Sequence, residues 1–535
     1  MADIETKLDP ISDDNKSLDH SSSSIANADV VSYGQGVDVA VDLVAGEHAN
    51  DAPVPPDVAS RIRRKLDWHL LPLLFLLYTC QGMDKGALGA TAILGIKKSA
   101  HLSGAQFNNL GSAFYIGFIV FEYGHSLALQ RFPVAKWLTF NIFLWALFIG
   151  CHAAAKSYGS LFALRFLLGA TEGAVTLSVM IVCNMFYNRT EIGERIGWTF
   201  QCNGLALIFS SVFSFAVYHA NPKASPNQWQ WLMIVNSIIS FIVFLLFLRF
   251  FPNNPSSAWF LTPEERVIAV KRIQENRNGI ETKKFKKHQF IEALRDPKTW
   301  LFFLFAAISN LQNGIGIQYG IIILSFGFKV WKVTLLSIPL GAVQIVGITV
   351  GGLFLRRFPN SRAWIGMGAF VAPMVGAILL VTLPLHNKHG LLAAYYVLNL
   401  SGASGFVMVL SWVTSTSAGH TKKLTTNGIF MIGYALGQIL STQFWKDSYK
   451  PRNYVPWGIT MGSYAGNWVL LLTLRWYLQR ENKRRDQLQA GLANEDDMFG
   501  YVERADEKGQ VVRQKVEKAL LDLTDRENLS FRYVL

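Results

Sequence analysis

Apolar residues fall in long runs along this chain, and short polar stretches separate the runs. A helix needs roughly 20 apolar residues to cross the hydrocarbon core of a bilayer, which is about the length of these runs. The short apolar runs and period-two alternation typical of a large soluble enzyme are absent from the sequence. The pattern predicts an all-α polytopic membrane protein with about twelve transmembrane helices: 67–95, 104–128, 137–155, 160–186, 196–219, 229–251, 298–325, 331–355, 362–384, 390–415, 424–446 and 454–478.

The longer polar stretches divide the chain into five parts. We expect a disordered cytoplasmic tail at 1–60, a six-helix bundle at 61–252, a cytoplasmic central loop at 253–297, a second six-helix bundle at 298–480 and a cytoplasmic tail at 481–535. Inside the central loop, Thr262 followed by Pro263 and Glu265 is typical of a capped helix start, and the residues after it predict an amphipathic helix.

Composition and charge support a membrane protein. Hydrophobic residues make up 51% of the 535 residues and charged residues only 16%, which is unlike a soluble domain. The formal net charge is +13, but the Lys and Arg side chains gather in alternate loops, so the charge does not indicate a nucleic-acid partner. By the positive-inside rule, both tails and the central loop are predicted to be cytoplasmic.

The chain shows no sign of secretion. Its four cysteines all fall inside predicted spans, so they indicate no disulfide framework. The N-terminal region lacks a basic start followed by an apolar core, so we expect no cleaved signal peptide. We expect a multi-pass membrane protein of the plasma membrane, with an endomembrane as the alternative.

The first apolar run contains a carboxylate and an ammonium group, Asp84 and Lys85, followed again by small and apolar residues. Placing each charge in a spanning helix costs roughly 2.5–3.5 kcal/mol, and such charges usually mark an ion or substrate path. The alternative is that the helix ends at Met83 and that the pair lies at the membrane interface.

The fourth run contains a second pair of charges, Arg165 and Glu172. Seven residues apart, they lie on one helix face but two turns from each other, so each needs a partner elsewhere. Asp84 and Lys85 are the expected partners. The alternatives are that Arg165 extends to the interface and that Glu172 has a structural role.

Other polar residues inside the runs are weaker signals. Glu122 and His125 in the second run predict a structural or gating ion pair rather than a proton site. Uncharged polar residues occur in the second bundle, where they either contact substrate or hold helices together. The candidates for substrate contact are Gln318, Tyr319, Asn399, Asn427 and Tyr434. No catalytic Ser-His-Asp set, metal-ligand spacing, phosphate-binding Gly loop or redox CxxC is present in the sequence, so we expect no enzyme activity, cofactor or metal.

Several of these stretches resemble the major facilitator superfamily, in particular its anion:cation symporter branch and the fungal allantoate-permease-like group. MDKGALG at 83–89 is similar to the family's D-R-x-N-x-G, FEYGHS at 121–126 to F-E-x-P-S-N, and RFLLGATEG at 165–173 to R-F-x-x-G-x-x-E. The central WFLTPEER and ALRDPKTW, the later AGHTKKLTTNGIFMIGYALGQ and the ending DLTDRENLSFRYVL resemble the group more specifically. Lys85 replaces the family's Arg, which leaves a point charge in place of a bidentate donor.

The resemblance implies proton-coupled uptake of a small organic anion of carboxylate, vitamin or ureide type, by a monomer among membrane lipids that alternates access between its two bundles. It implies that Asp84 and Glu172 carry protons, and that Lys85 and Arg165 attract the anion. Burial favours the protonated form of a carboxyl group, so we expect ionised Asp84 to neutralise Lys85 and protonated Asp84 to release it. The alternatives are an exporter of a fungal metabolite, a nutrient-sensing receptor and, least supported, a membrane enzyme.

Overall fold

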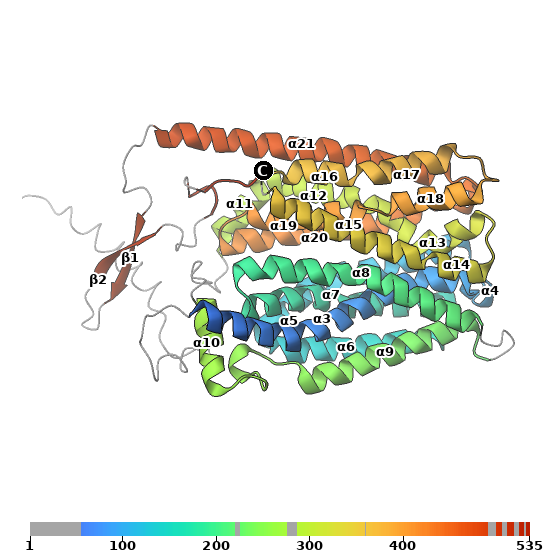
Figure 1. The fold of residues 1–535 in the computed structure, drawn as a ribbon, viewed down its shortest axis with the longest axis horizontal. Coiled ribbons are helices and arrows are strands. Elements are labelled where there is room, and N and C mark those ends of the chain that lie inside the picture. The colour runs from blue at the N-terminus through green and yellow to red at the C-terminus, as the bar shows by residue number, and fades with distance from the viewer. Residues whose placement is uncertain are drawn as a thin grey trace, which may run out of the picture.

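The structure is a computed structural model that describes residues 55–219, 225–274, 286–358, 360–490, 499–505, 511–517, 524–528 and 531–535. Long helices run side by side in two groups, one from each half of the chain (Figure 1). Helix α10 lies at one end of these groups and α4 at the other, and these are called here the α10 end and the α4 end.

The N-terminal half is built from six long, uninterrupted helices. They are α3 (Pro56–Ile93), α5 (Gly104–Arg131), α6 (Val134–His152), α7 (Tyr158–Phe186), α8 (Arg189–Tyr218) and α9 (Gln228–Phe250), with the short α4 (Ile96–Ser99) after α3. Each of the six predicted spans of this half coincides with one of them. The first helix runs past Met83 to Ile93, so Asp84 and Lys85 lie inside a helix and not at its end.

Interrupted helices distinguish the C-terminal half. Its six rods are α12 (Pro297–Asn310) with η2 (Leu311–Asn313) and α13 (Gly314–Ser325), α14 (Val330–Leu336) with α15 (Ile338–Arg357), α16 (Arg362–Ala369) with α17 (Val371–Thr382), α18 (Lys388–Leu398) with α19 (Gly402–Ser415), α20 (His420–Gln443) and α21 (Tyr454–Ala490). The breaks were not predicted, because an apolar run continues across them. In the described part of both halves together, seven helical segments are long and apolar enough to cross a membrane, judged by length and composition alone.

The central loop contains the predicted helix. α10 (Pro263–Gln274) begins where expected, and the two hydrogen bonds of its capping box join Thr262 and Glu265 in both directions. A 3-10 turn, η1 (Pro255–Ser257), precedes α10, and α11 (Lys287–Arg295) leads into the second half.

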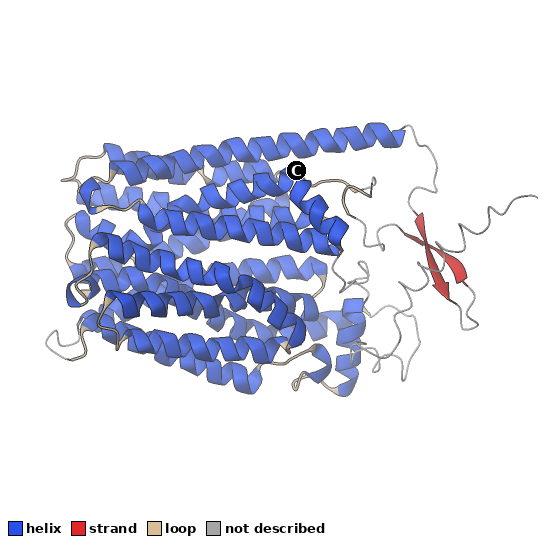
Figure 2. Ribbon diagram, turned by 180° about the vertical axis from the view of Figure 1, so that it is seen from behind, coloured by secondary structure: helices blue, strands red, loops and turns tan. Residues whose placement is uncertain are grey.

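The tail boundaries differ from the prediction. α3 begins at Pro56, before the expected end of the first tail at residue 60, and residues 1–54 lie outside the described part. α21 continues to Ala490, past the expected boundary at 480. Beyond it, β1 (Phe499–Ala505) pairs antiparallel with β2 (Val511–Glu517). The chain then returns to the bundle, where its C-terminal mark lies beside the helices (Figures 1 and 2).

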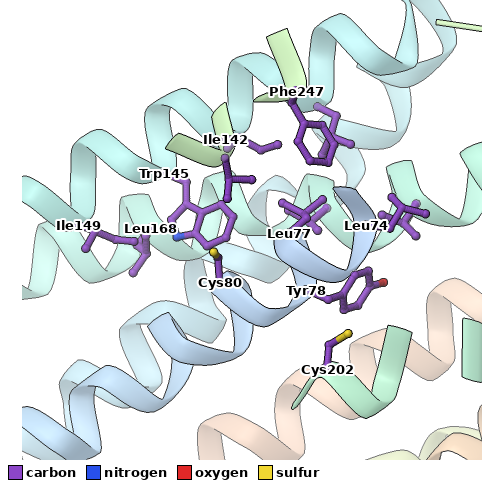
Figure 3. Packing of buried hydrophobic residues seen from close by; sticks show 14 of the residues in the cluster. Leu74, Leu77, Tyr78, Cys80, Ile142, Trp145, Ile149, Leu168, Cys202 and Phe247 are labelled. Carbon is purple, nitrogen blue, oxygen red and sulfur yellow. The ribbon is translucent and has the colours of Figure 1, made fainter. Parts of the chain in front are cut away.

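Each half has an apolar core of its own, and α3 lies in the middle of the first. Figure 3 shows Leu77 and Cys80 of α3 beside Trp145 of α6, while Tyr78 on another side of α3 lies toward Cys202 of α8. Tight packing of this core fixes the rotation of α3 and therefore the directions in which its neighbouring charged residues point.

Two glycines bring α5 and α7 into close contact. A Cβ atom at Gly169 of α7 would lie 1.8 Å from the carbonyl oxygen of Phe114, and one at Gly117 of α5 would lie 2.0 Å from that of Phe166. Small residues of this kind let membrane helices approach backbone to backbone. The contact sets the position of α7, which carries Arg165 and Glu172.

Candidate substrate and proton site

Lys85 and Glu172 form an ion pair inside the N-terminal half. The Nζ atom of Lys85 on α3 lies 3.1 Å from Oε1 of Glu172 on α7. The Glu172 side chain is fully buried, whereas 30% of the Lys85 side chain is exposed. Neither carboxylate oxygen has a well-directed hydrogen bond within the described residues, so the negative charge of Glu172 depends mainly on nearby cations. Gln81, one helical turn before Lys85, is also within electrostatic reach of Glu172.

Asp84 points elsewhere. It is buried, its carboxylate accepts a hydrogen bond of 3.4 Å from the hydroxyl of Ser240 on α9, and it interacts electrostatically with Arg165. Neighbouring residues on a helix point about 100° apart, which sends Asp84 into the N-terminal half and leaves Lys85 facing Glu172. The expectation that Asp84 neutralises Lys85 is therefore wrong: Glu172 is the partner of Lys85.

Arg165 is enclosed by the N-terminal half. Its side chain is buried and interacts electrostatically with Asp84 and with Glu172. The alternative that Arg165 extends to a membrane interface is thereby excluded. His152 of α6 is also buried beside Arg165, and its Nδ1 atom is hydrogen-bonded to the carbonyl oxygen of Phe148 at 2.7 Å. The four charges predicted from the sequence thus lie together inside the N-terminal half, and their formal charges sum to zero.

Aromatic rings from both halves gather around Tyr434, which lies near Lys85. Tyr434 of α20 is within electrostatic reach of Lys85, and its ring centroid lies 5.5 Å from that of Phe406, 6.3 Å from that of Tyr115 and 6.5 Å from that of Phe118. Tyr434 was predicted as a substrate contact. The other three rings were not singled out, because isolated aromatic residues in an apolar run carry no distinguishing signal.

The other predicted contacts of the C-terminal half, Tyr319, Asn399 and Asn427, have different surroundings. Tyr319 packs against Gly89, one helical turn beyond Lys85 on the same face of α3. Asn427 accepts a hydrogen bond of 3.5 Å from Thr414 of α19. The amide of Asn399 donates to the carbonyl oxygen of Tyr395 in its own helix at 2.8 Å. Tyr434 is thus brought to Lys85, and Tyr319 to α3 one turn beyond it. Asn399 and Asn427 are engaged within their own half.

Gln318 belongs to a set of hydrogen bonds that joins the two halves toward the α4 end. Its amide donates to Asn108 at 3.0 Å, and Asn108 donates to the carbonyl oxygen of Trp445 at 2.7 Å. One turn further along α5, the hydroxyls of Ser112 and Thr442 lie 2.7 Å apart. These contacts close the boundary between the halves on the α4 side of Lys85.

The expected ion pair between Glu122 and His125 is wrong. His125 uses Nε2 to contact the carbonyl oxygen of Ala170 at 2.5 Å. Oε2 of Glu122 is buried without a hydrogen-bond partner, and the described residues show no ion pair between the two side chains. Both lie against Gly173, where an added Cβ would be 3.4 Å from each.

Comparisons with known proteins agree with this fold. The sequence profile of the Major Facilitator Superfamily matches residues 74–442. The chain is 30% identical to the allantoate permease of Saccharomyces cerevisiae, over 95% of this chain and 92% of that protein. It is 32% identical to a thiamine pathway transporter of the same yeast, over 92% and 90% of the two chains. The high affinity cysteine transporter of this yeast is 29% identical, over 91% and 93%.

Solved structures share the architecture at low sequence identity. A D-xylose-proton symporter superposes with a TM-score of 0.60 at 12% identity, over 76% of this chain and 97% of that one. A bacterial homolog of the human lysosomal transporter Spinster gives a TM-score of 0.55 at 14% identity, over 79% and 96% of the two chains.

Proposed function

This chain belongs to the Major Facilitator Superfamily of membrane transporters, and we propose that it carries a small organic anion together with protons. The observation that carries the proposal is the ion pair of Lys85 and Glu172, in which a partly exposed cation faces a fully buried acid. Lys85 is the group that the anion binds, and Glu172 is the group that the proton binds.

The coupling follows from competition for Lys85. When Glu172 is ionised, its Oε1 atom lies 3.1 Å from Nζ of Lys85, and the ion pair opposes binding of another anion to Lys85. When Glu172 is protonated, Lys85 needs a new counter-ion, and the carboxylate of the substrate supplies it. Because linkage is reciprocal, the bound anion also favours protonation of Glu172. A proton and a monovalent anion add no net charge to the site, which avoids the cost of an unpaired buried charge.

Asp84 and Arg165 have a supporting role in this scheme. Asp84 interacts electrostatically with Glu172 and with Arg165, and Ser240 donates to its carboxylate. They hold the field around Glu172 constant while its own charge changes. Asp84 remains the second candidate proton carrier, behind Glu172, because it is the partner of Arg165 and not of Lys85.

The substrate lies between the halves, where the N-terminal half contributes Lys85 and the C-terminal half contributes Tyr319 and Tyr434. An organic anion is favoured because the exposed member of the buried pair is a cation. One relative is named an allantoate permease, and allantoate is a small carboxylate. We propose a substrate of this chemical class.

We propose that α10 and the two chain ends lie in the cytoplasm, that the α4 end faces outward and that the protein works as a monomer in the plasma membrane. This orientation follows from the Lys and Arg residues of the loops. With this orientation, the hydrogen bonds of Asn108, Ser112 and Gln318 close the boundary between the two halves on its outer side.

Uptake by intact cells tests the proposal. Cells that express the chain receive radiolabelled small carboxylates, allantoate among them, at an acidic and a neutral external pH, with and without a protonophore. The proposal expects faster uptake at the acidic pH and loss of accumulation with the protonophore. Accumulation that ignores both conditions, or selective transport of a cation, overturns it. Lys98→Ala, on an exposed position of α4, is the control for Lys85→Ala, which is expected to abolish uptake.

A further inference from the structure

The chain returns to its own bundle at residues 524–535, called here the C-terminal segment. Residues 491–523 separate it from the end of α21. It lies against the C-terminal half, toward the α10 end (Figures 1 and 2). Since a long connection precedes it, the segment meets the helices much as a separate peptide would.

Asp525 is the first anchor of this segment. Its side chain is fully buried and contacts Nζ of Lys298 on α12 and, at 2.9 Å, Nζ of Lys422 on α20. Both lysines are themselves at most 1% exposed. Burial alone would raise the pKa of Asp525, but the two ammonium groups hold it below its ordinary range. Asp296 lies 3.4 Å from Nζ of Lys298 and 2.9 Å from Nζ of Lys422, and Glu292 lies 2.7 Å from Lys422. Buried charges require such partners, and Asp525 is the one that the segment supplies.

Tyr533 is the second anchor. Its hydroxyl donates to Asp525 at 2.5 Å and accepts from Arg485 of α21 at 2.8 Å. The guanidinium carbon of Arg485 lies 4.5 Å from the centroid of the Tyr533 ring, and Nζ of Lys298 lies 4.6 Å from it. Cations this close to an aromatic ring attract it. One carboxylate and one phenol, eight residues apart, thus occupy a single site to which Lys298, Lys422 and Arg485 contribute cations.

The helices also recognise the backbone of the segment. Asn482 of α21 accepts from the amide of Tyr533 at 2.9 Å and donates to its carbonyl oxygen at 2.8 Å. Trp412 of α19 donates to the carbonyl oxygen of Val534 at 2.8 Å. The backbone amide of Arg362, at the start of α16, donates to the carbonyl oxygen of Leu535 at 3.1 Å. Main-chain hydrogen bonds combined with pockets for selected side chains are the usual mode of peptide recognition.

We propose that the α10 end of the C-terminal half is a peptide-binding site, and that its ligand is the chain's own segment 524–535. The site selects a peptide with an acidic residue and a tyrosine eight positions apart. Its receptor residues come from five rods, α12, α16–α17, α18–α19, α20 and α21, so the bound peptide ties the ends of these helices together. The inference concerns binding of the segment and is independent of the transported molecule.

A cleavable chain tests this inference. A protease recognition sequence is inserted within residues 518–523 of the full chain, which is purified, cleaved after folding and passed through a gel-filtration column. The fragment that contains the C-terminal segment is expected to elute with the transporter. A fragment that separates on cleavage alone overturns the proposal.

Competition then tests the two anchors. A synthetic peptide with the sequence of residues 524–535, added in excess, is expected to displace the cleaved fragment. The same peptide with Asp525→Ala is expected to compete at least about 100-fold more weakly, because it lacks the one carboxylate of the segment that both buried lysines contact. The matched control is Glu527→Gln. The carboxylate of Glu527 lies 3.7 Å from the exposed His288 and accepts from the backbone amide of Thr524 at 2.8 Å, a bond that the amide oxygen of Gln keeps. This peptide should compete as well as the native sequence. Equal competition by the Asp525→Ala peptide, or no displacement by the native one, overturns the proposal.

Discussion

Replacing Glu172 by Gln separates the proton from the anion most cleanly. The change keeps the size of the side chain and removes the carboxylate that lies 3.1 Å from Lys85. At this distance, two unit charges attract each other by about 5 kcal/mol at an effective dielectric constant of about 20. Because 30% of the Lys85 side chain is exposed, solvent screens the pair, and only part of this attraction is regained when an anion replaces Glu172.

The coupling energy between two sites is typically about 1–3 kcal/mol, which corresponds to about 5- to 150-fold in affinity. We therefore expect Glu172→Gln to bind the anion about 5- to 150-fold more tightly than the native protein at neutral pH, where Glu172 would otherwise compete. Accumulation driven by a proton gradient should be lost, because the amide cannot release a proton, while exchange of labelled for unlabelled anion should survive.

The assay combines equilibrium binding of the radiolabelled anion by purified protein with surface-normalised uptake and exchange in cells. Glu264→Gln is the matched control, since it makes the same chemical change at an exposed position on α10 and should alter neither. A Glu172→Gln protein that still accumulates the anion against its gradient would refute the reasoning, as would one that is well expressed but binds the anion more weakly than the native protein.

Three other changes probe the remaining parts of the account. Lys85→Arg should retain measurable anion uptake whereas Lys85→Ala should retain none, and equal uptake by both variants would show that the cation is dispensable. Gly89→Ala should slow transport several-fold or more, because the added Cβ would lie 2.7 Å from the carbonyl oxygen of Ile317 and obstruct closure of the α4 end. Gly316→Ala is the control, since a Cβ there meets nothing within 4 Å. The same slowing in both variants would remove the steric explanation. A cysteine introduced at Glu264 should react with a membrane-impermeant thiol reagent only after cells are opened, and labelling of intact cells would reverse the topology.

The positions of the spanning helices could be predicted because apolar length is a local property of the sequence. All twelve expected spans correspond to a rod of the structure, and the charged residues of the first and fourth spans were expected to be partners. The seven-residue spacing of Arg165 and Glu172 required a partner outside their own helix, which Lys85 supplies at 3.1 Å.

Which charge meets which could not be predicted. Asp84 and Lys85 are adjacent in the sequence, and the rotation of α3 that sends one to Ser240 and the other to Glu172 is set by packing with several other helices. The predicted ion pair of Glu122 and His125 was wrong for a related reason, because the imidazole contacts a nearby backbone carbonyl of α7 instead.

The docked C-terminal segment was missed because its signals are far apart in the chain. Lys422 appeared to be a loop charge that marks the cytoplasmic side, and Asp525 appeared to be an ordinary residue of a polar tail. Their contact at 2.9 Å joins residues more than 100 positions apart, and no local pattern announces it. Sequence periodicity predicts helices, whereas such a contact depends on the complete fold.

Proton movement that accompanies the anion tests the central claim most directly. Purified protein is reconstituted into vesicles that contain a pH-sensitive dye, and an inward gradient of the transported anion is applied without any initial pH difference. The account predicts that the vesicle interior becomes acidic with the native protein and that this signal disappears with Glu172→Gln, although the variant still exchanges anion. Anion entry without acidification by the native protein, or equal acidification by Glu172→Gln, would contradict it.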